Sequence, residues 1–265
     1  MKVLDLSKNP ICDLTLQFTR PSTSMTIHRG ARAQATAKNQ LLSALETAMR
    51  IYAPAREMCR YSSESFNETT YQPNVAAKVV GLAFLSAVAA WEDFVEDVYL
   101  GYLCGYQAPN GYAPRLRAGR TQNKSHALLL AAGESNKKDA ERRLRWSNFK
   151  WIQALSTIHF VPNNVFTAVA DKDVAWLDLA QIVRNRVAHN SENAKSQYKA
   201  ALNRLVGEKA NAPLPRGFSP GKFLIYQTNA DEQLLPLMED HHYWPDVFEG
   251  YMSLWQRLAD RLCPE

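Results

Sequence analysis

The stretch from Val75 to Leu103 constrains the fold most, because it is long, apolar and rich in alanine. Its first half is apolar on all sides, which is typical of a central helix that packs against several neighbours. Its second half is amphipathic, and Trp91, Phe94 and Val98 lie on one stripe. We therefore expect one long central helix around which the other elements pack.

The same periodicity continues through the rest of the chain. Apolar residues at steps of three and four predict helices over 31–58, 126–132, 138–158, 174–187, 192–206 and 244–262. Pro54 is expected to kink or end the first of them. The proline-rich stretch 212–221 predicts irregular structure, and 223–226 predicts a short strand. The sequence thus predicts an all-α fold, an up-and-down bundle of long antiparallel helices over 29–265, with an extended N-terminal arm over 1–28 and an extra C-terminal helix.

Composition excludes several classes of protein. The chain has 265 residues, 46% of them hydrophobic, which suits a folded domain, and its four cysteines lie far apart with no CxxC pair. The motifs of P-loop, dinucleotide-binding and α/β-hydrolase sites are absent. Residues 1–10 have no apolar run, and the run Val79–Trp91 is too short to cross a bilayer. We expect a soluble cytoplasmic protein with no metal, no cofactor and no membrane contact.

Positive charge is concentrated in one region. Ten basic and three acidic residues lie between Arg115 and Lys150, whereas the whole chain carries a net charge of +5. Such a region is expected where one face meets a polyanion, although a solvated surface of lysines and arginines gives the same pattern. The candidates for substrate binding here are Arg142, Arg143, Arg145 and Lys150. The nearby Trp146 and Trp151 are expected in the core.

The hexapeptide Arg184-Asn185-Arg186-Val187-Ala188-His189 has the richest chemistry. Arginine is always charged, histidine titrates near neutral pH, and the asparagine amide lies between them. On a continuous helix, Arg184 and His189 point about 140° apart, whereas Asn185 and His189 share a face. Because Asn190 and Ser191 are good capping residues, we expect one helix to end here and another to begin. His189 then lies at an exposed corner, and a second subunit is the other way to bring the two charged groups together.

The pattern Arg-Asn-x-x-Ala-His resembles the signature of the HEPN superfamily, an arginine followed after four to six residues by a histidine. The segment from Ser86 to Glu96 resembles the long helix of the HEPN branch that includes the RiboL-PSP group. The resemblance covers roughly Val75 to Val206. It implies a helical bundle that forms a homodimer with two motifs facing one cleft.

The same resemblance implies a metal-independent endoribonuclease of a bacterial defence or toxin–antitoxin system. RNA is then the substrate, and an antitoxin or a defence complex is a possible partner. Arg184, Asn185 and His189 take the catalytic roles, Arg186 is a candidate for binding substrate, and Glu92 is a candidate for tuning the site from the neighbouring helix. The expected products carry 2′,3′-cyclic phosphate and 5′-hydroxyl ends.

Two other interpretations remain open at this stage. Some HEPN proteins are noncatalytic and bind RNA or nucleotide or mediate assembly, and Arg184 could pair with Glu92 and simply hold two helices together. The chain could also be a helical interaction protein whose basic face meets an acidic partner.

Overall fold

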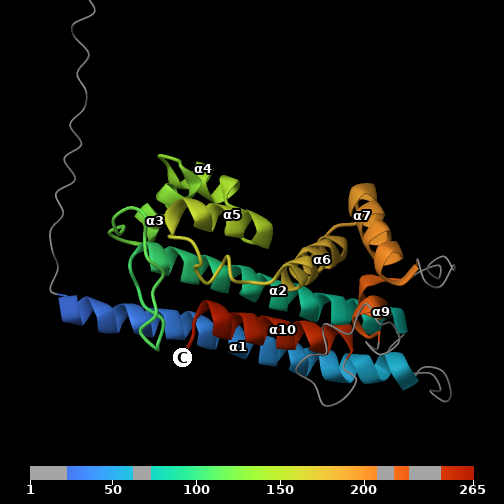
Figure 1. Cartoon of the computed structure of the whole chain (residues 1–265). Coiled ribbons are helices and arrows are strands. Elements are labelled where there is room, and N and C mark those ends of the chain that lie inside the picture. The colour runs from blue at the N-terminus through green and yellow to red at the C-terminus, as the bar shows by residue number, and fades with distance from the viewer. Residues whose placement is uncertain (1–22, 62–72, 208–217, 227–245) are drawn as a thin grey trace, which may run out of the picture.

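A computed structural model of the chain describes residues 23–61, 73–207, 218–226 and 246–265. These residues form helices and no strand, so the predicted all-α class is confirmed. The two longest helices, α1 (Thr23–Tyr61) and α2 (Pro73–Leu103), pack side by side as an antiparallel hairpin, and α10 (Val247–Leu262) lies along them (Figure 1).

Shorter helices complete the bundle, and three of them, α3, α6 and α9, contact α2 directly. They are α3 (Lys124–Ala132), α4 (Lys137–Arg143), α5 (Phe149–His159), α6 (Asp171–Ala188), α7 (Glu192–Leu202), the π-helix η1 (Asn203–Gly207) and α9 (Pro220–Leu224). Asparagine side chains accept hydrogen bonds from backbone N–H groups at the start of α3, α4 and α5. These caps explain why three short helices begin where they do.

Three local predictions were wrong, and a fourth is narrowed. Residues 23–28 belong to α1 and not to an extended arm, and residues 1–22 lie outside the described part of the chain. Of the two outcomes predicted at Pro54, the helix does not end there: α1 continues to Tyr61, and Tyr52 and Ala55 beside the proline are buried in the core. The predicted helix 138–158 is two helices, since Asn148 caps α5. The predicted strand over 223–226 is replaced by α9, which Ser219 caps.

The C-terminal helix is part of the main core. The rings of Tyr52 and Phe248 stack with centroids 4.1 Å apart, and Phe84 meets Phe248 and Tyr251 edge-on. Aromatic pairs of this kind add about 0.5–1.5 kcal/mol each beyond the area they bury. Although the family resemblance stops before it, α10 is therefore integral to the bundle.

Polar contacts fix the start of α10 against α1. Tyr52 donates a hydrogen bond to Asp246, which precedes the helix, over 2.5 Å. Arg56 Nη1 donates to Glu249 over 2.7 Å, and Arg56 Nε lies 3.1 Å from Asp246. The carboxylate side chains are 1% and 9% exposed, so burial strengthens these contacts relative to surface ion pairs.

By length and composition, helix α2 is long and apolar enough to cross a membrane. The sequence prediction considered only the shorter run Val79–Trp91, which is too short to do so. A core helix of a soluble protein meets the same criterion, and half of the apolar window of α2 is buried inside the bundle. It contacts α1, α3, α6, α9 and α10, as expected for the central helix.

Candidate functional site

Helix α6 lies antiparallel to α2 and carries the hexapeptide at its C-terminal end. Two contacts show this direction. Leu177 and Trp91 line one small cavity between the two helices, and Val187, ten residues after Leu177, lies against Gly81, ten residues before Trp91. A Cβ atom on Gly81 would lie 3.3 Å from a methyl carbon of Val187, so glycine permits this close approach. The contact holds the end of α6 against α2.

The predicted corner is present. Helix α6 ends at Ala188, and His189 follows in an extended conformation while its N–H donates to Asn185 O over 2.9 Å. Ser191 Oγ accepts a hydrogen bond from Ala194 N over 3.2 Å and so starts α7. His189 and Asn190 are exposed, which leaves the imidazole open to solvent.

Arg184 lies on the inner side of this corner. Its Nη1 donates to Asn185 Oδ1 over 3.1 Å, and its Nη2 lies 3.8 Å from Glu92 Oε2 on α2. The latter distance is an ion pair without a hydrogen bond. Arg184 Nε and Glu92 Oε1 are buried with no hydrogen-bond partner in the described part of the chain. The guanidinium is thus placed beside the corner but is only partly satisfied.

Burial raises the pKa of the Glu92 carboxyl above its ordinary value, and the negative charge of Asp93 adds to this, while Arg184 opposes it. The ion pair at 3.8 Å therefore does not offset the removal of this carboxylate from water. Glu92 also lines a small cavity with Trp255, whose Nε1 has no hydrogen-bond partner among the described residues. The structure therefore brings Glu92 close to Arg184. This proximity fits both interpretations of Glu92, as a residue that tunes the site and as a partner that holds α6 against α2.

Arg186 fastens the outside of the corner. Its Nη1 donates hydrogen bonds to His189 O over 3.4 Å and to Asn190 Oδ1 over 3.3 Å. The contacts are long and exposed, so they position the backbone of the corner weakly.

The basic candidates from the sequence lie beside α6 but not at the corner. Helices α4 and α5 lie over the other half of α2 from α7 (Figure 1), and the loop between them reaches α6, where Gln181 Nε2 donates to Ser147 Oγ over 3.2 Å. Ser147 also lines a small cavity with Glu92.

Lys150 lies 2.8 Å from Asp178 on α6, and Arg143 lies 2.8 Å from Glu134. Arg142 and Arg145 are exposed and make no ion pair with the residues that the structure describes. Of the four candidates for substrate binding, these two have no ion-pair partner in the part of the chain that the structure describes.

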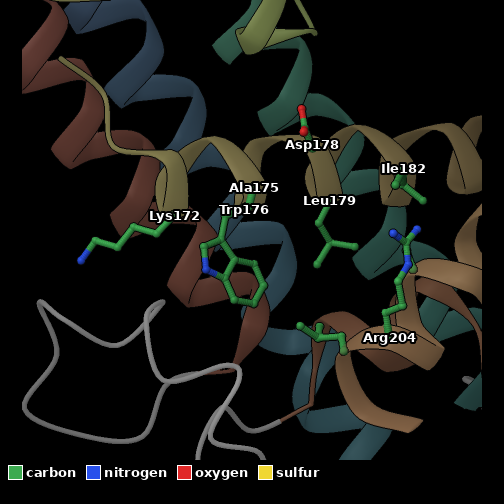
Figure 2. A pocket seen from close by; sticks show the side chains of 9 residues that line it. Lys172, Ala175, Trp176, Asp178, Leu179, Ile182 and Arg204 are labelled. Atoms are coloured by element: carbon green, nitrogen blue, oxygen red, sulfur yellow. The ribbon is translucent and has the colours of Figure 1, made fainter. Parts of the chain in front are cut away.

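A groove that the sequence did not reveal lies between α6 and η1. Figure 2 shows Trp176, Leu179 and Ile182 of α6 on one side and Arg204 on the other. Its volume is about 600 Å³ and its surface is mainly apolar. Trp176 and Leu179 were predicted as core residues and are indeed buried, but they also form this groove. The packing of α7 and η1 against α6 creates it, so no local pattern could have found it.

Among the residues that the structure describes, no group of three or more histidine, cysteine, aspartate or glutamate side chains could hold a metal ion. Comparison of the chain with protein-family models, with curated proteins and with solved structures found no match in any of the three. The functional argument therefore depends on the corner itself.

Proposed function

We propose that the chain is a metal-independent endoribonuclease of the HEPN type, acting in the cytoplasm as part of a bacterial defence or toxin–antitoxin system. One observation carries the proposal: α6 ends so that His189 is exposed at a corner, with Arg184 and Asn185 one turn away on the same helix end. The motif thus supplies an arginine, an amide and a histidine within six residues of one exposed helix end. RNA is the proposed substrate.

The chemistry uses the nucleophile that RNA already contains. The 2′-hydroxyl attacks the adjacent phosphorus while a base takes its proton, the P–O5′ bond breaks, and the leaving 5′-oxygen receives a proton from an acid. The products are a 2′,3′-cyclic phosphate and a 5′-hydroxyl. His189 is the proposed base, and His189 of a second copy is the proposed acid.

Arg184 is the proposed donor to the phosphate as negative charge develops on it. Its contact with Glu92 is long, at 3.8 Å, and its Nε has no hydrogen-bond partner among the described residues. The guanidinium is therefore not held by a hydrogen bond to Glu92. Asn185 Oδ1 holds Nη1 over 3.1 Å and so limits the directions in which the guanidinium points.

The second candidate function is a noncatalytic HEPN scaffold that binds RNA or nucleotide, or joins an antitoxin or a defence complex. The contact between Arg184 and Glu92 favours it, because an arginine that only joins α6 to α2 needs no substrate.

The test is RNA cleavage in EDTA by the wild type, by Arg184→Ala and by His189→Ala, with Lys199→Ala as the control. Lys199 is exposed on α7 and lies away from the corner. We expect the wild type and the control to release fragments with 2′,3′-cyclic phosphate ends, and the two site variants to cleave at least about 100-fold more slowly.

Absence of cleavage by the wild type, or equal cleavage by all four proteins, would show that the chain is not this nuclease. Salt-sensitive RNA binding without cleavage supports the scaffold instead.

A further inference from the structure

A small cavity lies where α2, α6 and α10 meet. Its lining includes Glu92 of α2, Gln181 of α6 and Trp255 of α10, together with Ser147 from the loop between α4 and α5. The cavity has a volume of about 10 Å³. This volume is near the smallest that holds one water molecule, and it is too small for any larger ligand.

Two of the lining residues each contribute a buried polar atom that lacks a partner. Trp255 Nε1 and Glu92 Oε1 are buried, and neither makes a hydrogen bond with the residues that the structure describes. Trp255 is fully buried in the core, so its N–H cannot turn to bulk solvent. Buried polar groups of folded proteins are nearly always paired with protein or with ordered water, because an unpaired one is costly.

The chemistry of the two atoms defines what can lie between them. The indole N–H of Trp255 only donates a hydrogen bond, whereas the ionised carboxylate of Glu92 only accepts one. A metal cation cannot accept from Trp255, and an anion is repelled by Glu92. The occupant is therefore neutral, accepts and donates at once, and consists of a single heavy atom. Water has all of these properties.

Ser147 offers a third hydrogen bond in the same cavity. Its Oγ accepts from Gln181 Nε2 over 3.2 Å, which leaves the O–H of Ser147 as a donor. A buried water molecule typically makes about three hydrogen bonds, so the cavity supplies a full set. Water can reach the site from the Glu92 side, because that side chain is 19% exposed.

We propose that this cavity binds one ordered water molecule, which accepts a hydrogen bond from Trp255 Nε1 and donates one to Glu92 Oε1. The water joins α10 to α2 through the same carboxyl group that meets Arg184. Its bond to Oε1 leaves Oε2 as the oxygen that lies 3.8 Å from Arg184. The water site follows from the cavity and the two buried atoms, and it does not rest on the proposed function.

The wild-type protein provides the first test. In a high-resolution crystal structure, we expect a peak of electron density in the cavity at about 2.7–3.2 Å from both Trp255 Nε1 and Glu92 Oε1. In solution, the indole proton of Trp255, identified by its loss in Trp255→Phe, should show a nuclear Overhauser effect to a long-lived water molecule. A cavity without density, or a direct hydrogen bond from Trp255 to Glu92, overturns the proposal.

A double-mutant cycle tests whether the two side chains are coupled. Trp255→Phe removes the donor, and Glu92→Leu removes the acceptor. Because either change breaks the same bridge, we expect the unfolding equilibrium constant of the double variant to rise at least about threefold less than the product of the two single effects. The loss of the ion pair with Arg184 occurs in both proteins that carry Glu92→Leu, so it cancels in the cycle.

Trp151→Phe is the matched control, because Trp151 does not line the cavity. Its effect on unfolding should multiply with that of Glu92→Leu without any coupling. Independent effects of Trp255→Phe and Glu92→Leu, in variants that circular dichroism shows to be folded, overturn the bridge. If a variant does not fold, the density and the Overhauser effect of the wild type decide the proposal.

None of these measurements depends on catalysis. A wild type that holds the water but cleaves no RNA refutes the nuclease and leaves the water site in place. A wild type that cleaves RNA but has an empty cavity refutes the water site and leaves the nuclease in place.

Discussion

The two ends of α6 are held in contrasting ways. At the N-terminal end, Asp173 is buried with its side chain 3% exposed, and it receives Arg257 at 3.1 Å and Arg261 at 3.4 Å from α10. At the C-terminal end, Arg184 is 32% exposed and meets one carboxylate at 3.8 Å. The first end is a buried, multiply bonded junction, and the second is a loosely paired arginine beside an exposed histidine.

This difference shows how firmly each end of the helix is held by the rest of the fold. A buried carboxylate with two arginines is costly to disturb, because removing one member leaves charges unpaired in a poorly solvated place. The ion pair of Arg184 is longer and more exposed, so we expect it to contribute less to stability. The same helix thus combines a firmly held end with a loosely paired end.

Replacement of Asp173 by alanine is the most damaging change that the comparison predicts. We expect the free energy of unfolding to fall by about 2–4 kcal/mol, since two arginines lose their shared carboxylate. Arg184→Met at the other end is expected to cost at most about 1 kcal/mol. Urea unfolding followed by circular dichroism measures both.

Asp171→Ala is the matched control for this prediction, because Asp171 begins the same helix but is exposed. Its effect is expected to stay within about 0.5 kcal/mol. If Arg184→Met destabilised the protein as much as Asp173→Ala, the C-terminal end would be a structural junction and the contrast between the ends would disappear.

Loss of the cap at the corner is expected to have a smaller effect. Ser191→Ala removes the acceptor for Ala194 N and leaves that N–H to water. The expected loss is about 1 kcal/mol, and hydrogen exchange should increase at the first turn of α7 without increasing at the start of α6. Ser196→Ala, in the exposed interior of α7, is the control and should be neutral or slightly stabilising. Unchanged exchange in Ser191→Ala would mean that packing, and not the cap, fixes the corner.

Local patterns were sufficient to predict this corner. The periodicity predicted a helix over 174–187, and the polar residues His189, Asn190 and Ser191 predicted its end, which the structure confirms within a few residues. Helix α2 was predicted for the same reason, because an apolar run of that length has few alternatives. Both elements depend on neighbours within one or two turns.

Long-range contacts were harder to predict. Asp173 and Arg257 are 84 positions apart, and nothing in the local sequence marks Asp173 as buried and Asp171 as exposed. The break between α4 and α5 was missed because Trp146 and Leu144 fit a helical period, although Asn148 starts a new helix. The pair of Arg184 and Glu92 was foreseen only as an alternative, since the register of two helices is a property of their packing.

The pH dependence of stability gives the smallest effect and the most specific test of the loosely held end. Burial raises the pKa of Glu92 in the folded protein, so the folded state binds this proton more tightly than the unfolded state does. The quantity to follow is the free energy of unfolding of the wild type minus that of Glu92→Gln. The contribution of the Glu92 proton to this difference is fully present below the ordinary glutamate pKa and is lost as the pH rises through the raised pKa. Above the raised pKa the difference no longer changes with pH.

Arg184 opposes this shift, which provides an internal check. In an Arg184→Met background, the pKa of Glu92 should rise further, so Glu92→Gln should change the stability more steeply with pH than it does in the wild-type background. The measurement is urea unfolding of the four proteins from pH 4 to pH 8. Equal slopes in the two backgrounds would mean that Arg184 does not interact with Glu92 in solution. An arginine in that state has no role in joining α6 to α2 and is left entirely to a ligand.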